Sequence, residues 1–212
     1  MAGRNVTRAT KPREETARKR REILRAATEV FGNKGYTKGS LAEIAEIVGM
    51  THAGVLHHFG SKDALLLEVL LYRDETDVEH LEEHHIPGGL DLFRHLVRTA
   101  KLNEERPGII QAFAVLSAES VTDDHPAKEF FRKRYETLRS EVTEALAEIC
   151  DPTDPPLAED VASAVQGIIA VMDGLQIQWL LAPDEIQLAR SSAFAIDAIL
   201  AAAIQGHHRR VM

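Results

Sequence analysis

The fold is decided by residues 40–59, which read SLAEIAEIVGMTHAGVLHHF. Ser40 can accept a hydrogen bond from a free backbone N–H at the start of a helix, and Glu43, three residues on, completes a capping box. Gly49 can adopt the left-handed conformation that ends a helix. The residues between them predict a short capped helix with one apolar face, because they recur at helical spacing: Leu41, Ile44, Ala45 and Val48.

A second short helix follows directly. Thr51 is its capping residue, Val55 and Phe59 fall on its inner side together with Leu56, and Ser61 then caps a third helix. Two short helices joined by a tight turn are typical of a DNA-reading helix-turn-helix. The side chains that this arrangement leaves facing outward are His52, Ala53, His57 and His58.

The charge distribution supports a nucleic-acid partner. The whole chain carries a formal charge of −8, but residues 1–62 hold 12 Lys or Arg against 6 Asp or Glu. Affinity for DNA comes largely from phosphate neutralisation, so a local basic surface matters more than the overall charge. Residues 1–14 lack helical periodicity and are predicted to form a disordered basic arm, for which the alternative role is solubility alone.

The remaining composition indicates a helical protein of the cytoplasm. Aromatic residues make up only 5% of the chain, and strand-like alternation is nearly absent. Cys150 is the single cysteine, so no disulfide can form within the chain. The N-terminus lacks the pattern of a signal peptide, and polar residues such as Asp173 interrupt the most apolar stretch, 161–182. Apolar periodicity predicts helices over about 15–34, from 61 to before 87, 90–105, from 107, from 126, 157–181 and 184–205.

The last two of these helices predict self-association. Apolar residues in the final helix recur at alternating spacings of three and four, which is typical of a heptad seam. The preceding helix is apolar on more than one face, so the pair needs a second layer to cover it. The alternative is that the chain's own helices provide that layer. A second copy is favoured, because a helix-turn-helix that reads one half-site is usually doubled by a two-fold axis. The predicted dimer residues are Val165, Ile169, Ile186, Ala189, Ala193, Ile196 and Leu200.

The segment from Arg21 to Leu70 resembles the N-terminal domain of the TetR family of bacterial transcriptional regulators. The resemblance implies an all-α protein with a three-helix DNA-binding domain over residues 15–62 and a helical ligand-binding and dimerisation domain over 63–212. It also implies a homodimer on a palindromic operator, usually a repressor that a small molecule releases. The matching residues are Ile23-Leu24-Arg25-Ala26-Ala27, Phe31, Gly35-Tyr36, Ile44-Ala45, Gly49-Met50-Thr51 and His58-Phe59-Gly60-Ser61-Lys62-Asp63-Ala64-Leu65.

The same resemblance implies which residues contact DNA. His52 and Ala53 would begin the recognition helix, and His57 and His58 would lie near its end. The chain departs from the family at Leu56, where Tyr is common, and Gly54 weakens the recognition helix by about 1 kcal/mol relative to Ala. The residues expected to contact the DNA backbone are Tyr36, Thr37, Ser40, Thr51 and Lys62.

A pocket for the effector is expected between the helices of residues 63–212. Asp173 is unusual within an apolar helix face, and either the dimer seam or a ligand would account for it. A ligand in the pocket is expected to shift the helix over residues 61–82 and so change the spacing of the two recognition helices. The candidate lining residues are Phe93, Gln111, Phe113, Leu116, Tyr135, Met172, Gln176 and Trp179.

No catalytic motif, cofactor or metal site is predicted. His57 and His58 lack a second ligand at fixed spacing, so groove contact or surface exposure is favoured over metal binding or proton transfer. His80 and His84 have a usable metal-ligand spacing, with acidic residues and His85 nearby, but a solvated helix end is the favoured interpretation. The competing hypothesis for the whole chain is a helical ligand sensor or adaptor that no longer binds DNA.

Overall fold

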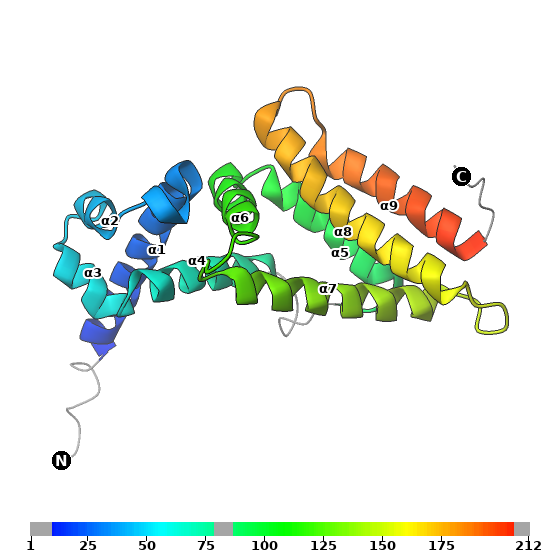
Figure 1. Cartoon of the computed structure of the whole chain (residues 1–212), viewed down its shortest axis with the longest axis horizontal. Helices are drawn as coiled ribbons and strands as arrows, with labels where there is room; N and C mark the ends of the chain where they lie inside the picture. The colour runs from blue at the N-terminus through cyan, green and yellow to red at the C-terminus, as the bar shows by residue number, and fades with distance from the viewer. Residues whose placement is uncertain (1–9, 79–86, 206–212) are drawn as a thin grey trace, which may run out of the picture.

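The computed structural model of the chain describes residues 10–78 and 87–205. Helices are the regular elements of this part of the chain, so the prediction of an all-α fold is confirmed. They are arranged in an elongated molecule with α2 and α3 at one end and α7, α8 and α9 running to the other (Figure 1). The helices are α1 (Thr10–Lys38), α2 (Leu41–Ile47), α3 (His52–Phe59), α4 (Lys62–Val78), α5 (Gly89–Asn103), α6 (Pro107–Glu119), α7 (Lys128–Ile149), α8 (Ala158–Leu181) and α9 (Leu188–Gln205).

The N-terminal unit is built on a core shared by α1, α2, α3 and α4. Ile23 and Phe31 of α1, Ile44 of α2 and Val55 of α3 have no exposed surface. The first half of α4 belongs to the same core, in which Leu65 and its apolar neighbours are buried. Phe113 and Leu116 of α6 and Phe131 of α7 complete this core, which therefore connects the N-terminal helices to the C-terminal part of the chain.

The first helix begins earlier than predicted. Residues 10–14 were expected to belong to a disordered arm, whereas α1 begins at Thr10. Pro12 lies in the first turn, where the missing N–H of proline costs nothing because that position has no intrahelical partner. Residues 1–9 of the predicted arm lie outside the described part of the chain. At the other end, Gly35 has φ 70° and ψ 178° and interrupts the helix, as its position in the sequence predicted.

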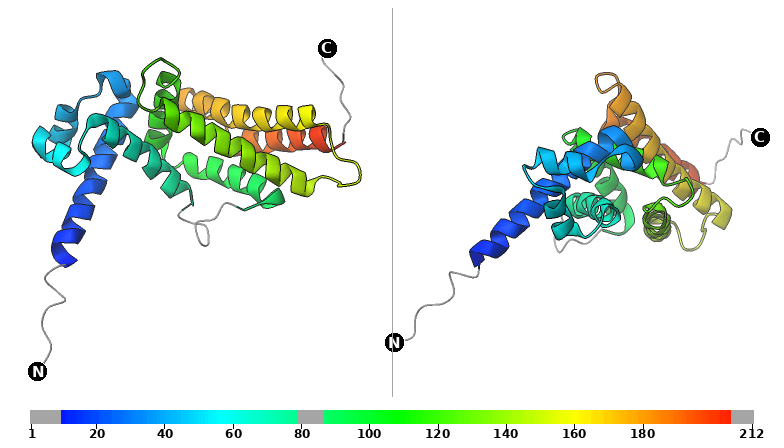
Figure 2. Two further views of the ribbon diagram at one scale, coloured as in Figure 1. Left: turned by 60° about the horizontal axis from the view of Figure 1, so that its bottom comes forward. Right: turned by 60° about the vertical axis from the view of Figure 1, so that its left-hand side comes forward.

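A second core joins α5, α7, α8 and α9. Leu146 of α7, Ile168 of α8 and Leu188 of α9 are fully buried in it. Figure 2 shows α7, α8 and α9 running along one another, with α6 at the end of this bundle next to the N-terminal unit. The predicted helix boundaries agree closely with these elements, except that α9 begins at Leu188 rather than at residue 184.

Helix α8 is the central apolar element of the bundle. Among the described residues it is the one helix long and apolar enough by composition to cross a membrane. Its buried side chains, including Ile168 and Trp179, pack against the chain's own second core. In this way 33% of its most apolar window is buried.

Candidate nucleic-acid interface and internal cavity

All three capping interactions predicted around the helix-turn-helix are formed. Ser40 Oγ accepts from the Glu43 N–H at 3.1 Å, Thr51 Oγ1 accepts from the Gly54 N–H at 3.1 Å, and Ser61 Oγ accepts from the Ala64 N–H at 3.0 Å. The Glu43 carboxylate pairs with Lys34 at 2.7 Å, so an ion pair replaces the reciprocal half of the capping box. Gly49, with φ 63°, makes the turn between α2 and α3.

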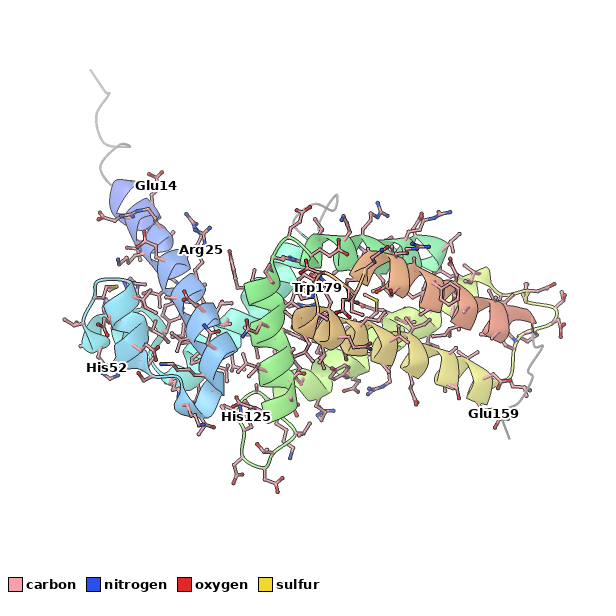
Figure 3. The ribbon with its side chains drawn as sticks, turned by 90° about the horizontal axis from the view of Figure 1, so that it is seen from above. Glu14, Arg25, His52, His125, Glu159 and Trp179 are labelled. Atoms are coloured by element: carbon pink, nitrogen blue, oxygen red, sulfur yellow. The ribbon has the colours of Figure 1, made fainter. Side chains whose placement is uncertain are left out.

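The outer surface of α3 is formed by His52, Ala53 and His57, which are exposed, whereas His58 is half-buried. On α2 the exposed residues include the apolar Ile47. Burial, together with the nearby charges of His57 and Arg20, lowers the pKa of His58. Figure 3 shows His52 at the end of the molecule away from the bundle that carries Trp179. Leu56, which stands where the related family commonly has Tyr, is half-buried against the first core.

Tyr36 and Lys62, both expected to contact the DNA backbone, form a cluster with the neighbouring Asp63 where α1 meets α4. Lys62 Nζ donates to the Tyr36 carbonyl oxygen at 2.6 Å and lies 4.3 Å from the centroid of the Tyr36 ring. The Tyr36 hydroxyl donates to the Asp63 carboxylate. Burial and this hydrogen bond raise the pKa of Tyr36 to about 12, and burial lowers the pKa of Lys62. Beside the cluster lie the exposed residues Thr37 and Ser40.

Two basic residues of α1 hold the helix-turn-helix in place. The sequence pattern did not indicate these contacts. Lys19 Nζ donates to the carbonyl oxygen of Val48, at the end of α2, at 2.8 Å. The Arg20 guanidinium lies 4.2 Å from the centroid of the Phe59 ring and pairs with Glu68. Part of the positive charge near the N-terminus therefore fastens α1 to its neighbours.

The C-terminal part of the chain reaches into the N-terminal unit at the interruption of α1. Glu119, the last residue of α6, accepts a hydrogen bond from the Tyr36 N–H at 2.6 Å. A Cβ atom at Gly35 would lie 2.0 Å from the Glu119 carboxylate, so the backbone and the carboxylate are in close contact. No local pattern could have identified Glu119, because its partner lies 83 positions away.

His125 stands beside this contact. Its side chain is 5% exposed, and its ring meets the Tyr36 ring edge-on at 5.2 Å between centroids (Figure 3 labels His125). Nδ1 accepts from the Ala127 N–H at 3.2 Å, and Nε2 is 3.8 Å from the Glu119 carboxylate. Burial lowers the pKa of His125, opposed by the negative charges of Glu119 and Asp63.

A cavity of about 570 Å³ lies within the C-terminal part. This volume is in the range of pockets that hold small organic molecules. Helices α4, α5, α7 and α8 contribute to it. The lining residues are Arg73, Leu92, His95, Leu96, Thr99, Phe130, Lys133, Arg134, Thr137, Leu138, Glu141, Val142, Ile168, Ile169, Met172, Asp173 and Gln176.

Two of the eight predicted pocket residues, Met172 and Gln176, line this cavity. Tyr135 reaches it indirectly, because its hydroxyl donates to Asp173 at 2.6 Å. Gln111 instead donates to the Gly32 carbonyl oxygen at 3.2 Å and lines a separate cavity of about 420 Å³ between α1 and α6. Four further predicted residues do not line this cavity and are buried in the two cores, and a role for them in ligand binding stays a prediction: Phe93, Phe113, Leu116 and Trp179.

Asp173 belongs to the cavity, which is one of the two positions predicted for it. Burial raises the pKa of its carboxyl group, while the Tyr135 hydroxyl and the charges of Arg73 and Arg134 lower it. The same two guanidinium groups lie 4.1 and 5.0 Å from the centroid of the Phe113 ring. One end of the cavity is therefore a charged cluster built by α4, α7 and α8.

The predicted heptad seam faces the chain's own core. Val165, Ile196 and Leu200 are buried in the second core, and Ile169 lines the cavity. These four residues thus already pack within one chain, and their contact with a second copy stays a prediction. Of the remaining three, Ile186 and Ala189 are partly buried against the second core, and Ala193 is also half-buried.

A different apolar stripe on α8 and α9 is open to solvent. Phe194 is 76% exposed and Leu181 is 81% exposed. Ile177 and Ile204 are also exposed, and small exposed residues such as Ala170 lie between them. This stripe is displaced from the predicted α9 seam by one residue, which is about 100° around a helix.

Metal binding finds no support in the described part of the chain. Among residues 10–78 and 87–205, no group of three or more His, Cys, Asp or Glu side chains is placed to hold a metal ion. The spacing of His80 and His84 noted in the sequence lies outside the described residues.

Comparison with protein families gives two matches. Residues 23–69 match the family described as bacterial regulatory proteins, tetR family. Residues 92–204 match the family described as BetI-type transcriptional repressor, C-terminal. The two matches cover the N-terminal unit and the bundle in turn.

Individual proteins show the same similarity over most of the chain. The probable HTH-type transcriptional regulator ArpR of Pseudomonas putida is 30% identical over 195 residues, which is 83% of this chain and 87% of ArpR. The HTH-type transcriptional regulator TtgR, also from Pseudomonas putida, gives the same values. A structure of SmeT with triclosan has a TM-score of 0.70 at 19% identity, covering 88% of this chain and 92% of SmeT. SmeT is the repressor of the Stenotrophomonas maltophilia multidrug efflux pump SmeDEF.

Proposed function

Because the chain belongs to the TetR family of bacterial transcriptional regulators, we propose that it represses transcription from a palindromic operator as a homodimer and leaves the operator when a small molecule binds. Members of this family are helix-turn-helix regulators rather than enzymes, and we place this one in the cytoplasm. The observation that carries the proposal is the outer surface of α3, where His52 and His57 are exposed, in a helix-turn-helix whose two helices are each fixed by a side-chain cap.

The proposed DNA contacts divide into two kinds. His52, Ala53 and His57 are exposed at the surface of α3 and would meet base edges in the major groove, with His58 at the helix end. The exposed hydroxyl groups of Thr37, Ser40 and Thr51, with Tyr36 and Lys62, would contact phosphates. Phosphate contacts would position the recognition helix, and the α3 side chains would select the sequence.

The proposed dimer uses the exposed stripe of α8 and α9. Phe194 and Leu181 are large apolar side chains left more than three-quarters exposed in a single chain. Large apolar side chains left exposed to this extent are typical of a surface that a partner covers. A two-fold axis through it would make the surface self-complementary and would carry two recognition helices, as a palindrome requires.

Helix α4 offers a route from effector to DNA. Its first half packs under α3 in the first core, and Arg73 in its second half lines the cavity. A ligand that displaces Arg73 would move a helix that is continuous with the DNA-reading unit. SmeT in complex with triclosan, a relative in fold, supports a small organic molecule as the effector.

The first experiment is binding of the purified protein to a pool of randomised duplex DNA at two salt concentrations, with sequencing of the enriched fragments. We expect enrichment of a palindrome and weaker binding at the higher salt concentration, because phosphate contacts release counterions. A single unrepeated half-site would contradict the dimer. Absence of enrichment would contradict DNA binding by the free protein and would favour the alternative of a sensor or adaptor.

A further inference from the structure

We propose that the effector is an organic acid with a single negative charge and an extended apolar body, held with its acidic group between Arg73 and Arg134. This inference rests on the proposed function, because it names the chemical class of the molecule that the cavity receives. It follows from the distribution of charge and of apolar side chains along the cavity.

The charged end of the cavity holds more positive than negative groups. The guanidinium groups of Arg73 and Arg134 lie over the same ring, that of Phe113, and both act on the carboxylate of Asp173. Lys133, at an exposed position on α7, lies at the edge of the lining and pairs with Glu129 at 3.6 Å. Among the described side chains of this end, two guanidinium groups therefore act on the carboxylate of Asp173.

The other end of the cavity is mainly apolar. Val142 lies eight residues beyond Arg134 on α7, which is about 12 Å along the helix axis. Ile168 and Ile169 of α8 and Leu92 of α5 line the cavity with it. The second carboxylate of the lining, Glu141, stands about 10 Å along α7 from Arg134, away from the charged cluster. An occupant that matches both ends has a polar head and an apolar body.

The charge of the ligand's polar head is inferred by comparing how a cation and an anion would interact with the charged end of the cavity. A cation would enter the field of Arg73 and Arg134, and like charges repel strongly in a partly buried site. A carboxylate would form charge-assisted hydrogen bonds with a guanidinium, which are roughly twice as strong as neutral ones. Asp173 opposes an anion, although burial raises the pKa of its carboxyl group and so reduces that opposition. The balance favours the acid.

The position of Arg73 connects this chemistry to regulation. Arg73 is 6% exposed and is carried by α4, whereas Arg134 belongs to α7 and Asp173 to α8. An anion between the two guanidinium groups would compete with Asp173 for Arg73. A bound anion would thus change the interaction between Arg73 of α4 and Asp173 of α8, which connects α4 to the bundle.

A matched set of three ligands tests the proposal. The probes are 4-phenylbutyrate, its neutral amide and 4-phenylbutylamine, which share an apolar body and differ in the charge of the head. Binding is followed by fluorescence of Trp179, the single tryptophan of the chain, which lies one helical turn from Gln176 of the lining. We expect the acid to bind about tenfold more tightly than the amide, and the amine to bind most weakly.

Substitutions locate the preference. Arg134→Met is expected to bring the acid and the amide to within about twofold of each other, while Asp173→Asn is expected to widen the difference. Arg73→Met should act like Arg134→Met, and Arg134→Met preserves the test if the buried position 73 does not tolerate the change. Arg139→Met is the control, since Arg139 is exposed on the same helix and does not line the cavity.

Three results would overturn the proposal: equal binding of the probes, tighter binding of the amine, or no binding of the acid. The proposed function is tested separately, by fluorescence anisotropy with the enriched palindrome. If the palindrome is bound and the neutral amide releases it as well as the acid does, the regulator stands and the acid class is wrong. If the acid binds selectively but no palindrome is found, the acid class stands and the proposed function is wrong.

Discussion

At the scale of single residues, two side chains proposed to contact phosphates are already held in place in the free chain. Lys62 is held against the Tyr36 ring and carbonyl oxygen, and Tyr36 is held by Asp63. Side chains that are already ordered lose less conformational entropy when they bind. The half-buried Leu56 forgoes the hydroxyl that a Tyr would offer, which increases the importance of these neighbours.

Replacement of Lys62 by Met should remove one phosphate contact. We expect operator binding to weaken about equally for all sequences, and the slope of log affinity against log salt concentration to fall by about 1. Fluorescence anisotropy over a salt series measures both quantities. Lys101→Met is the matched control, because Lys101 is exposed on α5 far from the helix-turn-helix. An unchanged slope for Lys62→Met would show that Lys62 only supports the fold.

At the scale of elements, the end of α6 is joined to the interruption in α1. Glu119 accepts from the Tyr36 N–H, and Gly35 with φ 70° allows the backbone to approach the carboxylate. The same Tyr36 carries the Lys62 contact, so α6 and the DNA-contacting cluster share one residue. Movement of α6 would therefore disturb the proposed phosphate contacts directly.

Glu119→Ala should leave the Tyr36 N–H without its acceptor. We expect the free energy of unfolding to fall by about 1 to 3 kcal/mol and operator binding to weaken with it. Glu119→Gln keeps an acceptor oxygen and is expected to retain most of both. Urea denaturation and anisotropy make the measurements, with Glu136→Ala on the exposed face of α7 as control. Equal losses for the Ala and Gln variants would point to the negative charge rather than the hydrogen bond.

The loop that carries His125 predicts a dependence of stability on pH. Because burial lowers the pKa of His125 in the folded chain, the unfolded chain binds more protons between that value and about 6.5. Stability should therefore be complete above pH 6.5 and decrease as the pH falls through the folded-state pKa. His58, whose pKa is also lowered, acts in the same direction.

His125→Asn should flatten this dependence, since Asn removes the titrating ring and can still accept from the N–H two residues on. Urea midpoints at pH 7.5, 6.5 and 5.5, at one protein concentration, give the comparison. Identical pH slopes in the two proteins would exclude His125 as a source of the effect.

At the scale of the whole molecule, the proposed dimer sets the distance between two recognition helices. The exposed stripe of α8 and α9 lies in the bundle, while α3 lies at the opposite end of the elongated chain (Figure 1). Small changes in the angle between α4 and the bundle would thus be enlarged at α3. This geometry favours control of half-site spacing over direct blocking of the DNA contacts.

Phe194→Asp should separate the dimer, because it places a charge in the centre of the proposed interface. Light scattering after gel filtration should report the mass of one chain, about 23.5 kDa, and operator binding should be lost with the dimer. Val121→Asp is the control, since Val121 is 78% exposed but lies outside α8 and α9. A Phe194→Asp protein that remains dimeric would move the interface elsewhere.

The helix-turn-helix and the all-α fold could be predicted from local sequence patterns. Caps such as Ser40, Thr51 and Ser61 and the break at Gly35 depend on residues within a few positions, so their geometry is encoded locally. The local pattern also identified the apolar faces of α8 and α9, although not which of them another helix would cover.

Three features could not be predicted from the sequence and are seen only in the folded chain: the side chains that line the cavity, the exposed face of α9 and the contact between Glu119 and Tyr36. Phe93 and Met172 both belong to the second core, yet Met172 borders the cavity and Phe93 does not. Apolar periodicity records that a side chain avoids water, and it does not distinguish a neighbouring helix from a ligand or a second chain. Those partners are set by contacts between residues far apart in the sequence.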